Sequence, residues 1–265
     1  MNSDVDLSIR QFSQAWQVMS AGSPDYTREV AEGVEYIFTG LPIGFFNVAL
    51  LTGRGGSADA LAAQGRKACA WASGRNVPWL FVVTDDVLAA GVDAAAALDG
   101  CGLAPMMPLT GMIAQRILPA SRVADGLDLK VPDEDRECSA LIDVNSVAYG
   151  MDLGAGKAII GTRSFWKDHV PVVGWTDGTP ASGAAVMMVD GYRYVALVAT
   201  DPAHQRRGYA EAAMRRALDV AAERHGDAPS FLHATDAGRP IYERMGYAAV
   251  CKHSIFIEKR FLEGH

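Results

Sequence analysis

The sequence has 265 residues, enough for one large domain or two small ones, each with a sizeable core. Apolar residues make up 49% and charged residues 21%, a composition typical of globular proteins. The formal net charge of −7 argues against a general nucleic-acid-binding protein, because contact with phosphate backbones requires a basic surface. The acidic balance weakly favours the approach of a cationic substrate.

The cysteines and the N-terminal residues indicate a cytoplasmic protein without membrane contact. The four cysteines form no Cys-x-x-Cys pair, so we expect reduced, mostly buried thiols and no metal cofactor; they are Cys69, Cys101, Cys138 and Cys251. The chain starts with Asp4 and Asp6 rather than with a basic and then apolar secretory pattern. No apolar run approaches the ~20 residues that a membrane span needs.

The first half predicts a helix followed by alternating strands and helices. We expect helices over 4–20, from Ser57 (the N-cap) to about 74, and over 87–98, and strands over 34–38, 46–52, 79–84 and 106–116. Residues 53–56 form a glycine-rich loop between the second strand and its helix. Gly102 ends the third helix.

The second half begins after a segment rich in charge and helix breakers, residues 120–134, where we place the domain boundary. We expect helices over 138–148, over 158–166 and from 209 to Gly226, and a short helix around Tyr242. Strands are predicted over 171–175, 181–189, 192–200 and 230–234, with turns at Asp177-Gly178 and Asp190-Gly191.

The order of elements in residues 51–103 is repeated in residues 199–247. Each segment contains a strand, a glycine-bearing loop, a helix, a strand, a second helix and a glycine. The residues themselves are hardly conserved between the two segments, so the repeat is one of architecture. The order predicts an internal duplication.

The most informative stretch of the sequence is a strand–loop–helix junction in the second copy. The valine-rich strand ends at Asp201-Pro202, because proline has no N–H for the sheet. The loop 205–208 then leads directly into a helix, whose first N–H groups are unpaired and lie at the positive end of its dipole. Gly208 lets the backbone approach a ligand, so the junction suits phosphate. The alternative is a basic, glycine-bearing corner without a ligand.

Two motifs in this half resemble the GNAT superfamily of acyl-CoA-dependent N-acyltransferases. The first is Gln-x-x-Gly-x-Ala at residues 205–210, between a strand and a helix. The second is a short helix with Tyr242, four residues before Gly246-Tyr247 and a final strand. The resemblance covers residues 127 to about 258 well and the first half only in outline.

The resemblance implies an α/β (α+β) chain of tandem GNAT-like folds, each a mixed, mostly antiparallel sheet flanked by helices. It implies acetyl-CoA as co-substrate. The main chain of Val198, Ala199 and Thr200 would hold the pantetheine arm. The CoA pyrophosphate would lie on the following loop and helix start: Gln205, Arg206, Arg207, Gly208, Tyr209 and Ala210.

The first copy departs from the GNAT pattern in both motifs. Its loop, residues 52–56, lacks the Gln-x-x-Gly-x-Ala frame, and its second helix has no tyrosine. We therefore expect a degenerate domain over residues 1–119 and a CoA-binding acetyltransferase domain over residues 120–265. Phe46 and Asn47 resemble a Phe-Asn of two-part GNAT enzymes, but we favour a core phenylalanine and a turn-holding asparagine.

Acyl transfer to an amine requires an acid for the departing thiolate and a neutral nucleophile. Tyr242 is the candidate acid, because a phenol with a pKa near ~10 is protonated at neutral pH. The alternative role is packing on the last strand. The strand 192–200 lacks the glutamate that many GNAT enzymes place there, and His233 is the candidate base. A core histidine is the more common outcome, so the base is unassigned.

The sequence therefore predicts transfer of an acetyl or other short acyl group from CoA to a primary amine of a small molecule or peptide. The acceptor site is expected between the halves, near groups such as Asn47 and Trp166. The competing hypothesis is a non-catalytic acyl-CoA-binding or regulatory module. A nucleotide phosphotransferase is disfavoured, because no Gly-Lys-Ser/Thr follows the glycine loop. The acceptor and the oligomeric state are not encoded in any pattern that we find.

Overall fold

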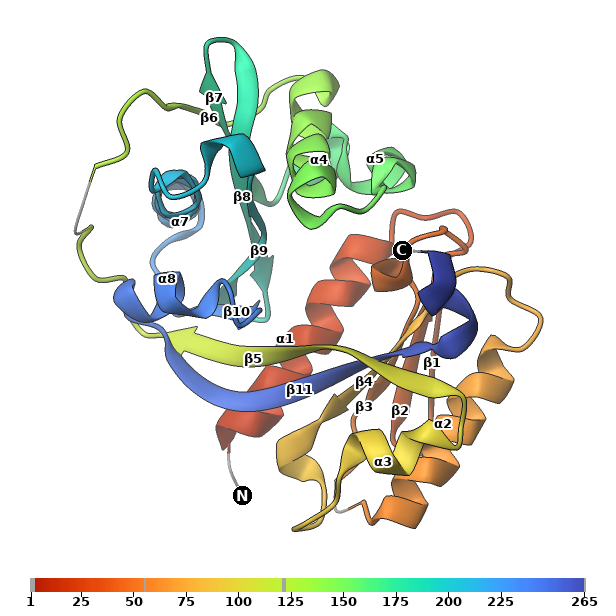
Figure 1. Ribbon diagram of the computed structural model, residues 1–265. Coiled ribbons are helices and arrows are strands. Elements are labelled where there is room, and N and C mark those ends of the chain that lie inside the picture. Colours follow the sequence, from red (N-terminus) through yellow and green to blue (C-terminus); the bar gives the residue numbers. More distant parts are fainter. Residues whose placement is uncertain (1–2, 55, 121–122, 265) are drawn as a thin grey trace. The chain divides into compact units, whose positions relative to one another are not determined.

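The computed structural model describes residues 3–54, 56–120 and 123–264 (Figure 1). The chain forms two compact units, and neither is a continuous segment. The first consists of the residues up to 112, residues 233–239 and the residues from 249 onward; the second consists of residues 113–232 and 240–248. Three strands contain residues of both units: β5 (Leu103–Ala114), β10 (Ser230–Ala234) and β11 (Ala248–Glu258).

The first unit is a mixed sheet whose strands are hydrogen-bonded in the order β1-β2-β3-β4-β11-β5. These strands are β1 (Thr27–Ala31), β2 (Val34–Phe38), β3 (Val48–Leu51), β4 (Leu80–Thr84), β11 (Ala248–Glu258) and β5 (Leu103–Ala114). The pair β3–β4 is parallel, whereas β1–β2, β2–β3 and β4–β11 are antiparallel. Its helices are α1 (Ser3–Ser20), α2 (Ala58–Ala72) and α3 (Ala94–Asp99), with 3-10 turns at Gly44–Phe46, Asp85–Val87 and Lys259–Gly264.

The alternation of side chains along β2 places helices on both faces of this sheet. Val34 and Tyr36 belong to the apolar cluster that contains Leu61 of α2 and Leu98 of α3. Glu35, on the other face, accepts a hydrogen bond of 2.5 Å from Ser13 of α1. The sheet is thus covered by α2 and α3 on one face and by α1 on the other.

The second unit is a sheet in the order β10-β9-β8-β7-β6, antiparallel except for the parallel pair β9–β10. The strands are β6 (Asp128–Lys130), β7 (Val170–Thr176), β8 (Thr179–Val189), β9 (Tyr192–Thr200) and β10 (Ser230–Ala234). The helices are α4 (Asp135–Tyr149), α5 (Lys157–Ile160), α6 (Arg163–Trp166), α7 (Tyr209–His225) and α8 (Arg239–Arg244), with 3-10 turns at Gly154–Gly156 and Pro202–His204.

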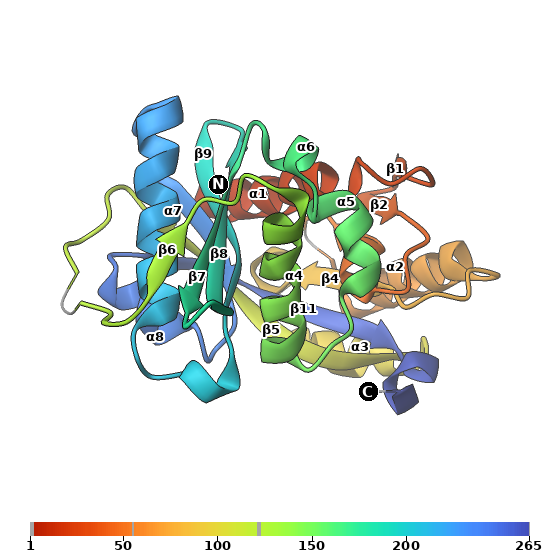
Figure 2. The ribbon, with the colours of Figure 1, turned by 90° about the horizontal axis from the view of Figure 1, so that it is seen from above.

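Helices α4 and α7 lie on opposite faces of this sheet (Figures 1 and 2). The α4 face is close-packed at Gly183 of β8, where an added Cβ would lie 2.3 Å from Leu141 Cδ1. The α7 face buries Ala213, Met214 and Ala217, which recur at the spacing of one helix face. The fold is therefore mixed α/β with mostly antiparallel pairing, as predicted.

The element order predicted for the internal repeat is confirmed. β3, α2, β4, α3 and β5 in the first copy match β9, α7, β10, α8 and β11 in the second. The first pair of strands in each copy is parallel, as this order requires. The last strand of the second copy, β11, pairs with β4 in the first unit.

Three details of the prediction are wrong for local reasons. The helix expected over 87–98 begins only at Ala94, because Gly91 adopts a φ of +80° and Asp93 caps the new start. The helix expected over 158–166 is two short helices, α5 and α6, separated at Gly161. The short edge strands β1 and β6 were not predicted, since most of their residues are exposed and give no apolar pattern.

Candidate active site

The loop after β9 has a backbone that turns the chain sharply into α7. Asp201 accepts a hydrogen bond of 2.8 Å from the N–H of Ala203 and starts a single 3-10 turn. Arg206 (φ +62°) and Gly208 (φ +84°) then both adopt left-handed conformations. A glycine adopts this conformation without strain, which accounts for Gly208 at the helix start.

The first turn of α7 has no side-chain cap. Gly208 occupies the N-cap position and has no side chain to accept from the first N–H groups. Glu211, the one acidic residue of the first turn, is buried and paired with Arg215, whose Nε lies 3.0 Å from Oε1. Arg206 and Arg207 are exposed beside this turn. The helix start therefore combines uncapped donors, a positive dipole end and two cations.

The strand that precedes the loop is distorted where it approaches its end. The register of β8 and β9 shifts between Gly183 and Ala185, and Leu197 has a φ of +54°. Tyr149 donates a hydrogen bond of 3.1 Å to the carbonyl of Val198, and Asn145 donates one of 3.2 Å to that of Leu197. Helix α4 thus contacts the irregular part of β9 through two polar side chains.

The remaining predicted cofactor residues lie in the same corner of the second unit. The carbonyl of Ala199 accepts a hydrogen bond of 2.8 Å from Ser182, whose hydroxyl also lies 2.9 Å from that of Thr200. Tyr209 is buried and donates to the carbonyl of Asp125 over 3.0 Å. Gln205 is exposed on the loop, and Ala210 follows in the first turn of α7.

Tyr242 is the most buried side chain of α8, with 9% of its surface exposed. Its ring centroid lies 6.1 Å from that of Tyr247 in an edge-to-face arrangement. Burial raises the pKa of Tyr242 above its ordinary value, and the neighbouring phenols of Tyr149 and Tyr247 raise it further. Within the described residues its hydroxyl makes no hydrogen bond, whereas Tyr247 shares one of 2.5 Å with Ser230.

Tyr149 connects two of the predicted site residues within the second unit. It donates to Val198 and is close enough to Tyr242 to affect its pKa. Asn145 and Tyr149 were not predicted as site residues. Their spacing of four residues on one helix face was the available signal, but α4 was expected to end before Tyr149.

His233 belongs to the first unit, in a buried polar cluster with Ser8 and His253. Ser8 Oγ lies 3.0 Å from His233 Nε2 and 2.9 Å from His253 Nε2. The ring of Phe12 packs edge-on to His233 at 4.6 Å. Burial, reinforced by His253, lowers the pKa of His233 well below its ordinary value. These contacts are those of a hydrogen-bonded core histidine, the more common alternative.

His253 completes this cluster and was not predicted from the sequence. Its Nδ1 lies 3.0 Å from Thr84 Oγ1, and its Nε2 lies 3.3 Å from Cys251 Sγ. Burial lowers the pKa of His253 to about 3, so the ring is neutral near pH 7. Ser8, on α1, could not be linked to it because the two residues are far apart in the sequence.

Asn47 and the cysteines have the structural roles that the sequence suggested. Asn47 is fully buried, and its amide binds the backbone of the turn around it: Thr39, Gly40, Leu41, Ile43 and Pro78. It therefore does not line an open acceptor site. All four cysteines are thiols, and burial raises the pKa of Cys69, Cys138 and Cys251 to about 11.

Comparison with known proteins adds an independent observation about this corner. Residues 191–250 match the family model described as "Acetyltransferase (GNAT) domain". This segment of the chain is similar to the GNAT acetyltransferase family. The matched segment contains β9, the loop 205–210, α7, β10 and Tyr242. No curated protein matches the sequence.

Solved structures share the fold of the GNAT domain and of the chain around it. A GCN5-related N-acetyltransferase from Kribbella flavida is 18% identical, with 95% of each chain covered and a TM-score of 0.69. One from Sphaerobacter thermophilus is 15% identical over 97% of this chain and 93% of that one, with a TM-score of 0.61. A tandem GNAT protein from the clavulanic acid biosynthesis pathway is 13% identical over 96% and 94%, with a TM-score of 0.54.

Two features are absent from the residues that the structure describes: a membrane-spanning helix and a cluster of metal-binding side chains. In that part of the chain no helix is both long enough and apolar enough to serve as a membrane span. The same residues contain no group of three or more His, Cys, Asp or Glu side chains arranged to hold a metal ion.

Proposed function

We propose that this protein transfers an acetyl or other short acyl group from CoA to a primary amine of a small molecule or peptide. The observation that carries the proposal is the Tyr242 hydroxyl. The Tyr242 residue is 9% exposed, its hydroxyl has no hydrogen-bond partner within the described residues, and it lies in the same unit as the uncapped start of α7. A departing CoA thiolate requires a proton donor, and a phenol without another partner can serve as one.

The CoA pyrophosphate would bind at residues 205–210. The N–H groups of the first turn of α7 would donate to its oxygens, with Gly208 allowing the close approach. Arg206 and Arg207 would add charge-assisted hydrogen bonds. The pairing of Glu211 with Arg215 supports this assignment, because it holds the one acidic charge of the first turn away from the phosphates.

The pantetheine arm would extend along the end of β9, against the main chain of Val198, Ala199 and Thr200. The left-handed Leu197 interrupts the pairing of β9 with β8 and leaves the backbone irregular at this point. A backbone N–H there would polarise the thioester carbonyl and stabilise the oxyanion that forms on attack. Tyr149, which donates to Val198, would be displaced or shared when the arm binds.

Tyr242 would protonate the sulfur as the carbon–sulfur bond of the tetrahedral intermediate breaks. Its raised pKa keeps the phenol protonated throughout the physiological range. A phenol with a raised pKa is a weaker acid, but the thiolate beside it becomes a stronger base in the same desolvated surroundings. The hydroxyl would thus serve as donor to the leaving group.

His233 is the candidate base for the attacking amine. The amine must lose a proton with a pKa near ~10 before it attacks. A histidine whose pKa is lowered is neutral and can accept a proton, but it has little driving force to do so. Ser8 already contacts its Nε2. We keep His233 as the candidate to be tested and expect water to carry the proton.

We assign CoA binding to residues 120–265 and a supporting, degenerate role to residues 1–119. The alternative function is a non-catalytic acyl-CoA-binding module, which the absence of a carboxylate from the described strand β9 (Tyr192–Thr200) favours. A turnover screen decides between them. Acetyl-CoA should release CoA with at least one amine from a panel of amino acids, polyamines, aminoglycosides and peptide N-termini. Tight binding without release across the panel would support the module instead.

A further inference from the structure

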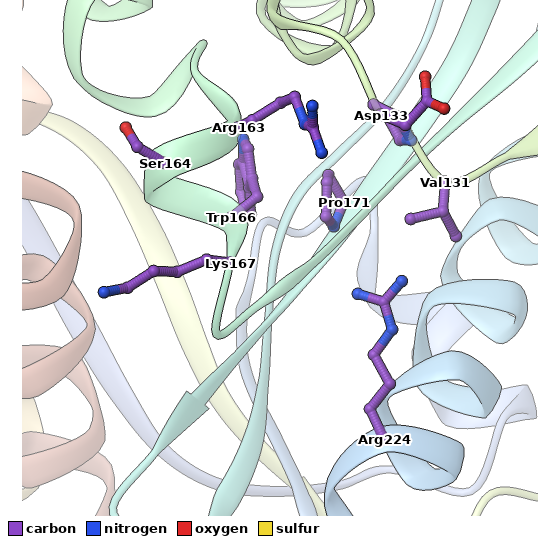
Figure 3. A pocket seen from close by; sticks show the side chains of 9 residues that line it. Val131, Asp133, Arg163, Ser164, Trp166, Lys167, Pro171 and Arg224 are labelled. Carbon is purple, nitrogen blue, oxygen red and sulfur yellow. The ribbon is translucent and has the colours of Figure 1, made fainter.

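The second unit has a hollow of about 430 Å³ that the acyl-transfer proposal does not use (Figure 3). It is formed by the segment that follows β6, by helix α6 and the residue after it, and by the start of β7 and the end of α7. Its residues include Val131, Trp166, Pro171 and two arginines, Arg163 and Arg224. All of them belong to the second unit.

The two arginines point into the hollow from different elements. In Figure 3 the guanidinium of Arg163 lies on one side of Pro171 and that of Arg224 on the other. Both side chains are exposed, and neither guanidinium has an ion pair or a hydrogen bond within the described part of the chain. Two unpaired cations on one hollow are notable in a chain with a net charge of −7.

The other charged residues of the hollow do not neutralise this pair. The carboxylate of Asp133 points away from both guanidiniums, and Lys167 extends in another direction (Figure 3). Lys167 is itself 3.7 Å from the carboxylate of Asp168. Arg163 and Arg224 are therefore the two arginines of the hollow whose guanidiniums have no ion pair within the described residues.

Between the two arginines the surface is apolar. Trp166 is 4% exposed, and its indole N–H donates to the carbonyl of Ile160 over 2.7 Å, so its ring adds no unpaired donor. Pro171 and Val131 continue this floor. An occupant would thus meet apolar side chains below and guanidinium groups on two sides.

We infer that this hollow binds a small molecule that carries a phosphoryl group on an apolar body. The planar guanidinium fork matches the geometry of phosphate oxygens, and two forks from separate elements can hold one dianion. The apolar floor would contact the body of the ligand. The site is separate from the loop 205–210, because Arg224 lies fifteen positions after Tyr209 on α7, which corresponds to about 22 Å at 1.5 Å per residue.

The inference is independent of the proposed acyl transfer and is tested by binding alone. Phenyl phosphate is the probe, titrated calorimetrically into the full-length Arg206→Gln/Arg207→Gln variant, in which the phosphate loop is weakened. Arg163→Gln/Arg224→Gln in that background should raise the dissociation constant about tenfold or more, since two charge-assisted contacts are lost. Arg216→Gln, which changes another exposed arginine of α7, and Lys167→Gln should each change it less than about threefold.

Two further readouts place the ligand. The Nε–Hε resonances of Arg163 and Arg224 should shift together on titration, while that of Arg216 stays in place. Inorganic phosphate should bind more weakly than phenyl phosphate, because it makes no contact with the floor. Unchanged affinity in the Arg163/Arg224 double variant, or an equal loss in the Arg216 control, would overturn the site. Equal affinity for the two phosphates would overturn the role of the floor.

Discussion

The two strand–loop–helix corners of this chain share their order of elements but differ in what happens to their backbone donors. In the first copy, the N–H groups of Thr52 and Gly53 donate to the carbonyl of Gly33 over 2.7 and 2.9 Å. The hydroxyl of Ser57 accepts from the first turn of α2 over 3.2 Å. This corner therefore satisfies several of its own donors. Its Gly55 lies outside the described residues.

The second corner leaves its corresponding groups available. Gly208 caps α7 without a side chain, and neither Arg206 nor Arg207 has an ion pair within the described residues. Arg54, the basic residue of the first loop, is paired with Asp6 instead. The comparison leads us to expect no CoA site in the first corner, because its own side chains and carbonyls occupy the donors that a ligand would use.

The second helices of the two copies differ in the same sense. Helix α3 buries Leu98 against the first unit, whereas α8 buries Tyr242, whose hydroxyl has no partner within the described residues. The second helix of the first copy thus contributes only apolar packing, whereas that of the second copy also carries the phenol of Tyr242. The following predictions test this division, beginning with the largest effect.

The largest effect should come from Tyr242→Phe. If the hydroxyl protonates the thiolate, the single-turnover rate with saturating acetyl-CoA and amine should fall ~10²–10⁴-fold. A pre-steady-state measurement is needed because slow product release can hide the loss in kcat. The affinity for acetyl-CoA should stay within about twofold, since the loop at Gly208 carries the pyrophosphate.

The stability of Tyr242→Phe serves as its internal control. The hydroxyl has no hydrogen-bond partner within the described residues, so its loss should change the free energy of unfolding by less than about 1 kcal/mol. Tyr247→Phe is the matched variant, because that hydroxyl is bound to Ser230. It should lose more stability than Tyr242→Phe and less activity. A parent-like single-turnover rate in Tyr242→Phe would leave the tyrosine a packing residue.

The next largest effect concerns the polar cluster of Ser8, His233 and His253, which we expect to affect the stability of the first unit. His253 has a folded-state pKa of about 3 and an ordinary value of 6.5, so the unfolded chain binds the proton more readily. Stability should therefore fall as the pH drops from about 6.5 towards 3, by about 3 kcal/mol at pH 4 from this group alone. His233 acts in the same direction.

Chemical denaturation at pH 7 and pH 4 measures this difference. In His253→Gln the loss of stability between the two pH values should be smaller than in the parent by about 2–3 kcal/mol. His225→Gln, at an exposed histidine that ends α7, is the matched control for the replacement of a histidine by glutamine. An identical pH dependence of stability in His253→Gln and the parent would show that other groups cause the loss of stability at low pH.

A smaller but more specific effect is expected at the phosphate loop. Gly208→Val places a branched side chain at a φ of +84° and on the approach to the pyrophosphate. The affinity for acetyl-CoA should fall about tenfold or more, equivalent to 1.4 kcal/mol or more. Gly226→Val is the matched control, because Gly226 has a φ of +86° at the other end of the same helix. Equal affinity losses in the two variants would assign the effect to strain in α7.

The smallest effect is expected in the first corner. Arg54→Ala should leave the affinity for acetyl-CoA unchanged, because Arg54 is paired with Asp6 and its loop does not bind CoA in this account. The free energy of unfolding should fall by less than about 1 kcal/mol, the ordinary value of an exposed ion pair. A clear loss of CoA affinity would show that the first copy retains a function in binding.

The predictable part of the structure was the part encoded by local patterns. The apolar stripe of α7, the turns at Asp177 and Asp190 and the repeated element order all follow from periodicity and turn residues. The helix break at Gly91 was not predicted, because it depends on a backbone conformation. The exposed strands β1 and β6 were not predicted, because they form only through pairing with neighbouring strands. The division into domains at residues 119 and 120 stays a prediction, since compactness does not report which part binds CoA.

The candidate site was predictable only where its residues lie close together in one sequence motif. The loop 205–210 and Tyr242 follow from short spacings, but their assigned roles stay predictions. Tyr149 and the Ser8–His253 contact depend on residues that folding brings together from distant positions. No local pattern predicts such contacts. The environment of His233 was therefore accessible only from the structure.

The stoichiometry of acetyl-CoA binding tests the central claim most directly. Calorimetric titration of the parent chain should give one site per chain, because among the described residues of the two corners it is the second that leaves its arginines and its helix N-cap without partners. The same titration of Gly208→Val should show that single site weakened, with no second site remaining. Two equivalent sites in the parent, or one site that Gly208→Val leaves intact, would contradict the account.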